Sequence, residues 1–195
     1  LYYSPQYWTS DDTDAIERLA IQEGTALIYP LSAMGAHVSD CPNHTVGRVT
    51  PFETRGYVAL AGTFGYELDV TKIPAEDRAM IPEQVAMYHK YNDLVREGDY
   101  YRIASYSENN YYDCYGVVSK DKKEALFTFV QVINRANYHS RRIFLKVTLH
   151  LTLLQKVSAQ FVLTPALTAP RAVLTTYLQI CLKLKTPRFS LVKKA

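Results

Sequence analysis

The sequence is poor in cysteine and has no long apolar run. Its 195 residues include only three cysteines, which are widely separated: Cys41, Cys114 and Cys181. An odd number of distant cysteines forms neither a disulfide framework nor a Cys-x-x-Cys metal site, so a reducing cytoplasm is the simplest compartment. The uncharged stretch at residues 157–170 has about 14 residues and two prolines, which is too short to cross a bilayer. We therefore expect no transmembrane helix.

Motifs for nucleotide binding are also missing. The chain contains neither G-x-G-x-x-G nor G-x-x-x-x-G-K-[ST], and it has no G-x-S-x-G elbow around a nucleophilic serine. It begins Leu-Tyr-Tyr-Ser-Pro, without an initiator methionine, a basic segment or an apolar signal region. We therefore expect it to come from the middle of a longer protein.

Acidic residues and glycine are absent from the last third of the chain. Residues 1–124 carry all 19 acidic residues and 11 basic ones, a balance of −8, whereas residues 125–195 carry 11 basic residues and no acid. No glycine follows Gly116. A basic tail for nucleic acid or an anionic membrane is one explanation, but the basic residues are scattered among Leu, Thr and Val rather than set on one face. The other is that the tail from about residue 147 is a translated frameshift, which adds no ordered structure.

Helix signals and one buried strand alternate along the first 100 residues. Asp14 suits the N-cap of a helix over about residues 14–28, because Glu17 three residues later completes a capping-box pattern. Residues 35–39 form a short apolar run between turn residues, which is typical of a buried strand.

Two further helices have recognisable starts. The first is predicted to have Thr50 as N-cap and Pro51 at its first position, and to end near residues 62–65. The second is predicted to begin at Pro82 and to end before Gly98.

The pattern changes to strands after Gly98. Three segments are rich in Tyr, Val, Phe and Ile: residues 100–104, 111–118 and 125–132. A polar connection over 119–123 joins the last two as a hairpin. The order of elements predicts the end of an α/β domain followed by a small antiparallel β domain.

Three carboxylates lie within four residues near the N-terminus: Asp11, Asp12 and Asp14. They stand where a strand would lead into a helix, the position at which barrel enzymes keep catalytic groups. Helix capping is the simpler explanation and fits Asp14 best. Asp11 and Asp12 are then left in the loop without a structural role.

A second group of candidate residues, His37, Cys41 and His44, has a spacing that zinc ligands could use. No further ligand or supporting residue is evident nearby, so we expect these histidines to anchor a loop. The 16 tyrosines could stack on sugars, but those in the predicted strands are explained by β-propensity and packing.

Several long and rare strings resemble the C-terminal part of bacterial glycoside hydrolase family 36 α-galactosidases. They extend over about residues 2–146 and include Trp8-Thr-Ser-Asp-Asp-Thr-Asp-Ala-Ile-Glu-Arg-Leu19, Pro30-Leu-Ser-Ala-Met-Gly-Ala-His-Val-Ser39, Pro42-Asn-His44 and Thr63-Phe-Gly-Tyr-Glu-Leu-Asp69. Asp40 and Cys41 depart from the family pattern, which has small or apolar residues there.

The resemblance implies a fold class of α/β plus β, the C-terminal portion of a (β/α)8 TIM barrel followed by part of a small antiparallel β domain. Residues 1–98 would be the last strands and helices of the barrel, residues 99–146 part of the β domain, and residues 147–195 an unmatched tail.

The same resemblance implies a retaining hydrolase of melibiose- and raffinose-type oligosaccharides that needs no metal or other cofactor and is commonly a homotetramer. Asp11 falls on the family's acid/base aspartate in the S-D-x-T-D motif. The nucleophile belongs to a K-W-D motif that this chain lacks, since its only tryptophan is Trp8. We therefore expect the 195 residues alone to be inactive. A non-catalytic carbohydrate-binding or structural β module is the alternative, and neither nucleic acid nor a membrane is expected as partner.

Overall fold

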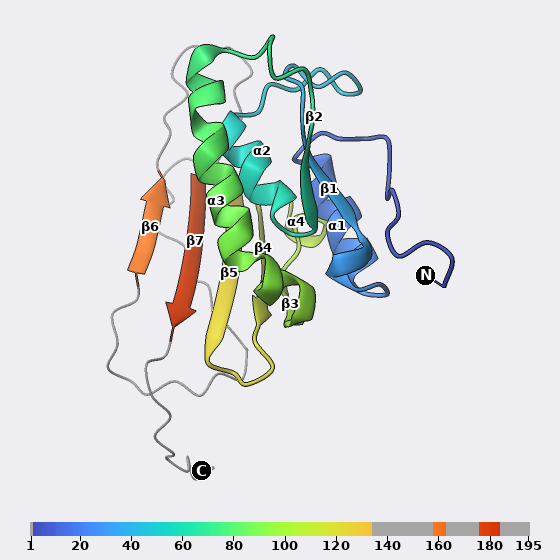
Figure 1. Ribbon diagram of the computed structural model, residues 1–195, viewed down its shortest axis with the longest axis vertical. Coiled ribbons are helices and arrows are strands. Elements are labelled where there is room, and N and C mark those ends of the chain that lie inside the picture. Colours follow the sequence, from blue (N-terminus) through green and yellow to red (C-terminus); the bar gives the residue numbers. More distant parts are fainter. Residues whose placement is uncertain (1, 134–157, 163–175, 184–195) are drawn as a thin grey trace.

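The structure is a computed structural model (Figure 1). Two parallel strands lie at the centre of its N-terminal half. β1 (Gly35–Ser39) pairs with β2 (Thr63–Glu67), and α2 (Phe52–Ala59) runs between them along the chain. The buried strand predicted at 35–39 is confirmed. β2 was not predicted, because Gly62 before it and Gly65 within it indicate the end of a helix rather than a strand. The structure describes residues 2–133, 158–162 and 176–183.

Tyr7 adds a third parallel strand position. It forms a parallel bridge with Met34, and its main-chain oxygen accepts a hydrogen bond of 3.2 Å from the Gly35 amide. The Thr63 amide binds the Met34 oxygen at 2.8 Å, so the Tyr7 segment and β2 lie on opposite edges of β1. α1 (Glu17–Ala26) connects the Tyr7 segment to β1 through the short helix η1 (Leu31–Ala33). The order along the chain is therefore the Tyr7 segment, α1, β1, α2 and β2, in which strands and helices alternate.

The two faces of this parallel sheet have different neighbours. Ala36 and Val38 of β1 pack with Phe52 and Ala59 of α2 in one buried cluster. Their neighbours along the strand point to the opposite face, because side chains alternate. His37 therefore lies on the face turned away from α2.

α2 and α3 begin at different residues from those predicted. Pro51 is the N-cap of α2 in an extended conformation (φ −53°, ψ 146°), and no side chain caps the helix. The prediction of Thr50 as N-cap is wrong, because the helix starts only after the proline. α3 (Ala75–Glu97) starts after Pro74 and contains Pro82 in its interior. The earlier start lets Met80 and Ile81 pack on the β1–α2 cluster, which offsets the backbone hydrogen bond that Pro82 removes.

An antiparallel sheet of five strands makes up the second half, in the order β3-β4-β5-β7-β6. It consists of β3 (Asp99–Ala104), β4 (Tyr112–Val118), β5 (Glu124–Gln131), β6 (Ser158–Val162) and β7 (Thr176–Lys183). A short helix that was not predicted, α4 (Tyr106–Asn109), lies between β3 and β4. The predicted hairpin is confirmed: β4 and β5 pair in continuous register, and the Ser119 amide binds the Glu124 oxygen at 2.8 Å.

The tail adds two strands to this sheet. β7 pairs with β5 along its whole length, and β6 pairs with β7. The expectation that nothing after residue 147 is ordered is wrong for these two strands. Without β7, β5 would present a free edge of amide and carbonyl groups, which favours pairing with any segment of high β-propensity. The strands are separated by 13 residues, so their connection does not need a tight turn with glycine. The rest of the tail lies outside the described residues.

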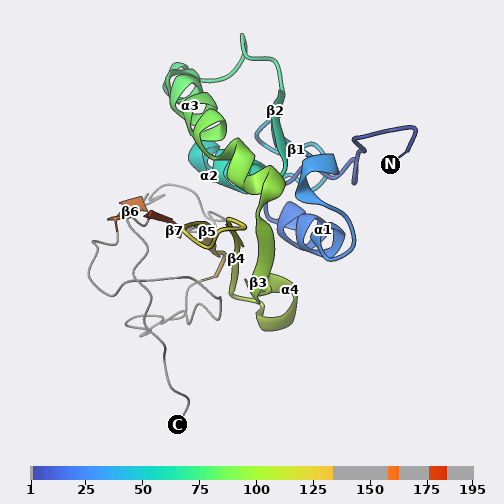
Figure 2. The same cartoon turned by 60° about the horizontal axis from the view of Figure 1, so that its bottom comes forward.

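α1, α2 and α3 lie on one side of the antiparallel sheet (Figure 2). One buried cluster joins Ile16 and Leu19 of the α1 region to Tyr115 and Val130 of the sheet. A second cluster joins Met34 and α3 to β4 and β5. The two halves of the molecule thus share their core.

None of the helices in the described ranges is both long and apolar enough to cross a membrane. α3 has the length, but charged residues occur throughout it.

Candidate active site

The carboxyl ends of the three parallel strand positions lie at one edge of their sheet, because parallel strands run in the same direction. The loop 10–14 follows the Tyr7 segment at this edge, and Asp40 and Cys41 follow β1 there. In α/β proteins this is the edge at which ligands bind and catalytic groups are found. We therefore take loop 10–14 as the centre of the candidate site.

Asp14 has a structural role in this loop. Its carboxylate is 1% exposed, and Oδ2 accepts hydrogen bonds from the amides of Ile16 (3.1 Å) and Glu17 (3.0 Å). It also forms an ion pair with Arg48. Burial raises the pKa of Asp14, whereas the Glu17 amide and Arg48 act in the opposite direction. α1 begins at Glu17 with Ile16 as its N-cap residue and no side-chain cap, so the prediction of Asp14 as N-cap of a helix over residues 14–28 is wrong. Asp14 instead fixes the turn that leads into α1, where its main-chain oxygen also accepts the Arg18 amide (2.8 Å).

Asp12 stabilises the loop locally, and Asp11 does not. Asp12 Oδ1 accepts the Asp14 amide at 3.1 Å, and the Asp12 amide donates to Ser10 Oγ at 3.0 Å. The Asp11 side chain is exposed, and its carboxylate forms no hydrogen bond or ion pair within the part of the chain that the structure describes. The loop therefore leaves Asp11 available to a ligand.

Two residues that the sequence did not single out for this role hold Thr13. Ser39 Oγ donates to the Thr13 main-chain oxygen at 2.9 Å, and Asn43 Nδ2 donates to Thr13 Oγ1 at 3.3 Å. All three residues are buried. No local signal could have indicated these contacts, because the partners are 26 and 30 residues apart.

The segment 43–48 brings Arg48 to this loop. Asn43 Oδ1 accepts the amides of Thr45 (2.9 Å) and Val46 (3.1 Å), and Gly47 adopts a positive φ of 67°. This tight turn directs Arg48 toward Asp14 and toward Glu17, where the distance from Nη2 to Oε1 is 3.2 Å. Arg48 thereby ties the turn to the first helical residues.

Trp8 stacks on His37 beside the loop. The ring centroids are 4.3 Å apart and the planes differ by 29°. Trp8 is 50% exposed, so one part of its ring is open. Burial lowers the pKa of His37, and Arg18 adds to this effect. The pair places an aromatic surface on the sheet face turned away from α2.

The structure does not bring His37, Cys41 and His44 together as a metal site. Among the described residues, no three His, Cys, Asp or Glu side chains are grouped so that they could hold a metal ion. Cys41 and His44 are exposed, whereas His37 is partly buried against Trp8.

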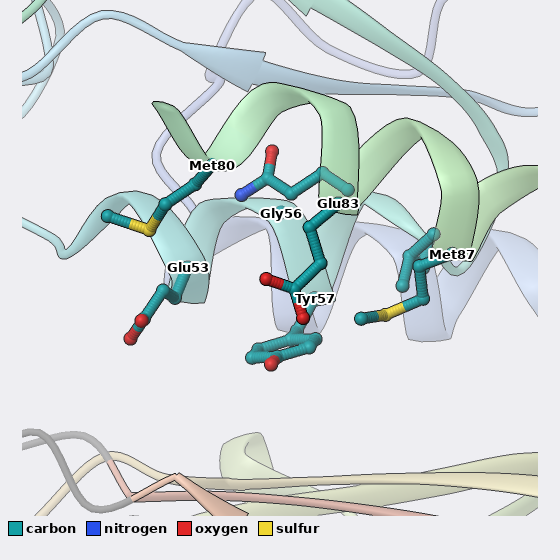
Figure 3. Close-up of a pocket in the computed structure, with 8 residues that line it drawn as sticks. Glu53, Gly56, Tyr57, Met80, Glu83 and Met87 are labelled. Carbon is teal, nitrogen blue, oxygen red and sulfur yellow. The ribbon is translucent and has the colours of Figure 1, made fainter. Parts of the chain in front are cut away.

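Two of the hollows among the described residues lie between α2 and α3. One, of about 470 Å³, lies behind the end of β1 between the first turns of α2 and α3, and it includes Asp40, Arg55 and Asp77. The other, of about 200 Å³, lies between the middle parts of α2 and α3 (Figure 3). There, burial raises the pKa of Tyr57, and Glu53 and Glu83 add to the increase. Neither hollow includes a residue of loop 10–14.

The fold and the loop define a chain of (β/α) units with an exposed aspartate at the strand ends, and comparison with known proteins gives the family. A profile of the melibiase family matches residues 1–98. The chain belongs to this family.

Individual relatives agree. The chain is 53% identical over 137 residues to α-galactosidase AgaA of Geobacillus stearothermophilus. The aligned residues make up 70% of this chain and 19% of that protein. It is 49% identical over 137 residues to the bifunctional α-galactosidase/sucrose kinase AgaSK of Mediterraneibacter gnavus, covering 70% of this chain and 14% of that protein. The chain thus spans less than a fifth of the length of these relatives.

Solved structures also match. The crystal structure of GH36 α-galactosidase AgaA from Geobacillus stearothermophilus superposes with a TM-score of 0.78 at 40% identity, over 94% of this chain and 26% of that one. The α-galactosidase of Lactobacillus brevis gives a TM-score of 0.77 at 35% identity, over 97% of this chain and 28% of that one. The resemblance to family 36 is confirmed. These superpositions extend beyond residue 146, where the resemblance in the sequence ends.

Proposed function

We propose that the complete protein is a retaining α-galactosidase and that this chain supplies its general acid/base, Asp11. The main support is the position of Asp11, which is exposed at the carboxyl end of a parallel strand in a chain that belongs to the melibiase family. Asp12 and Asp14 have hydrogen bonds that account for them, and Asp11 has none among the described residues.

The proposed barrel assignment follows from the same strands. Residues 1–98 would form the last strands and helices of a (β/α)8 barrel, with the Tyr7 segment, β1 and β2 as consecutive strands. The face that carries Trp8 and His37 would then be the inner face of the barrel. Residues 99–146 would belong to the C-terminal β domain, and the five-stranded sheet continues it through β7 and β6.

The proposed mechanism has two steps. In the first, protonated Asp11 gives its proton to the glycosidic oxygen while an ionised carboxylate attacks the anomeric carbon and forms a galactosyl–enzyme. In the second, ionised Asp11 takes a proton from the water that hydrolyses this intermediate. The two carboxyl groups must lie about 5–5.5 Å apart on either side of the sugar, so Asp12 in the same turn is a poor candidate for the nucleophile. We infer that the nucleophile comes from the upstream part of the protein.

The proposed substrates are oligosaccharides with a terminal α-linked galactose, of the melibiose and raffinose type. Crystal structures of AgaA variants hold raffinose and stachyose, which supports this class. A homotetrameric complete protein remains a prediction from the family resemblance.

Purified complete protein should release galactose from melibiose and from an aryl α-galactoside. The 195-residue chain alone should release none, because half of the carboxyl pair is absent. Turnover by the 195-residue chain above a blank would contradict the division of catalytic residues, and an inactive complete protein would contradict the function.

A further inference from the structure

The loop that carries Asp11 is held by residues at the end of β1 and in the segment that follows it. Ser39 binds the main-chain oxygen of Thr13 and Asn43 binds its side-chain oxygen. The exposed fractions of Ser39, Asn43 and Thr13 are 4%, 5% and 3%. Thr13 is therefore fixed through both its main chain and its side chain, only two residues from Asp11.

Ser39 is itself fixed by Arg55 of α2. Arg55 Nη1 donates to the Ser39 main-chain oxygen, and Nε donates to the Thr50 oxygen at 3.0 Å. Nη2 lies 3.4 Å from Asp77 Oδ2 in the first turn of α3. Arg55 is 5% exposed, so its hydrogen bonds are made away from water and hold a single arrangement. The end of β1 is thereby tied to both helices.

The residues around Asp11 are anchored within the loop as well. Ser10 accepts the amide of Asp12, and Asp12 accepts the amide of Asp14. Because the Asp11 carboxylate has no bond of its own among the described residues, its position depends on the main chain on either side. The Ser39–Thr13 hydrogen bond links that main chain directly to the end of β1.

We propose that Ser39 is a positioning residue for the acid/base reaction, and this inference rests on the proposed role of Asp11. Its hydroxyl holds the Thr13 carbonyl and thereby sets where the Asp11 carboxyl stands relative to the glycosidic oxygen. Proton transfer needs heavy atoms about 2.6–3.2 Å apart. A displacement of about 1 Å lowers rates by up to about 100-fold.

The test is Ser39→Ala in the complete protein, measured as kcat/KM on two substrates. Melibiose has a poor leaving group and requires protonation by Asp11, so its kcat/KM should fall by about 10- to 100-fold. A dinitrophenyl α-galactoside has a leaving group that needs no proton, so its kcat/KM should fall by less than about threefold. Ser39→Thr keeps the hydroxyl and should restore melibiose turnover.

Thr63→Ala is a matched control. Thr63 Oγ1 donates to the main-chain oxygen of Ser32 at 3.3 Å, which is the same type of bond at the amino end of β2. Its loss should lower kcat/KM for both substrates equally, by no more than about twofold. Thermal unfolding of each variant separates loss of fold from loss of positioning.

Asp11→Ala separates failure of this inference from failure of the proposed function. If Asp11→Ala shows no dependence on the leaving group, the proposed function fails. A different outcome is that Asp11→Ala shows the expected dependence while Ser39→Ala loses activity equally on both substrates, or loses no activity on melibiose. In that case only the positioning role of Ser39 is overturned.

The double variant should be no slower on melibiose than Asp11→Ala, within about twofold, because the effects of residues that act together are not additive. If Ser39→Ala does not fold, Ser39→Cys should give an intermediate loss on melibiose, and equal losses on both substrates would overturn the role.

Discussion

The two sheets of the molecule bury different kinds of side chain. The antiparallel sheet meets the helices mainly with apolar and aromatic residues, among them Tyr115, Val117, Leu126 and Val130. At the carboxyl edge of the parallel strands the buried side chains are polar: Thr13, Asp14, Ser39, Asn43 and Arg55. Apolar contacts depend on burial and have no direction, whereas hydrogen bonds depend on direction. The difference suggests that the antiparallel sheet provides stability and that the strand ends provide geometry.

The largest effect should come from the exposed carboxylate. Asp11→Ala in the complete protein should lower kcat/KM for melibiose by about 10²- to 10⁴-fold, because the leaving group then departs without a proton. Thermal stability should not change, and added azide should partly restore turnover of activated substrates. Asp12→Asn, which keeps its oxygen acceptor, is the control. If the leaving-group effect appears in Asp12→Asn and not in Asp11→Ala, the wrong aspartate has been assigned.

Removing apolar volume from the antiparallel sheet should lower stability and leave the leaving-group dependence of catalysis unchanged. Leu126 is 4% exposed and packs with Met34, Tyr91 and Val95. Leu126→Ala should lower the free energy of unfolding by about 2–5 kcal/mol, as measured by urea unfolding. The ratio of kcat/KM between melibiose and an activated substrate should stay unchanged. Lys123→Ala on the exposed hairpin should change stability by no more than about 0.5 kcal/mol.

Asp113 is a buried carboxylate in the antiparallel sheet, and it predicts a pH dependence. It is 1% exposed, and burial raises its pKa from 3.8 to about 7, opposed by the Tyr106 amide that donates to Oδ2 at 3.0 Å. The folded protein then binds more protons than the unfolded chain between about pH 4 and 7. Stability should therefore fall as the pH rises through this range.

Asp113→Asn keeps an oxygen acceptor for Tyr106 and removes the charge. Relative to this variant, the unaltered protein should lose on the order of a few kcal/mol between pH 4 and pH 7. Thermal midpoints of both proteins across the pH range give the measurement. Parallel curves for the two proteins would mean that Asp113 does not titrate in this way.

Asp14→Ala should give the smallest of these effects. It removes the acceptor for the Ile16 and Glu17 amides, which should lower the free energy of unfolding by about 1–2 kcal/mol. The Asp14 carboxylate binds the Ile16 and Glu17 amides and Arg48 rather than Thr13. The leaving-group dependence should therefore shift less than in Ser39→Ala. A larger shift than in Ser39→Ala would place the control of Asp11 at the helix and not at β1.

The antiparallel sheet was easier to predict than the site, for a physical reason. Its strands are rich in β-branched and aromatic residues, and that composition is visible in segments of seven or eight residues such as Tyr112–Val118 and Glu124–Gln131. The hydrogen bonds of Asp14 also follow from a local signal, since their partners are two and three residues away, although α1 begins later than predicted. The assignment of Asp11 came from the family resemblance and is still a prediction.

The missing parts depended on distant partners. β2 has little sequence signal of its own and exists because its Thr63–Glu67 backbone pairs with β1. Ser39 and Asn43 resemble ordinary loop residues until the fold places them against Thr13. β7 forms because it pairs with the edge of β5. The paired residues are far apart in the sequence, since Gln131 and its partner Thr176 are separated by 45 positions.

The core shared by the two sheets has a consequence for local opening. Ile16 and Leu19 lie in the same cluster as Val130 and Tyr115, so α1 cannot detach without exposing the central strands. Regions that share a core open together, with a free energy close to that of global unfolding. Amide hydrogen exchange in α1, β4 and β5 should therefore respond as one group to denaturant. Loop 10–14, which joins this group at Asp14, would then keep its arrangement until that cooperative group unfolds.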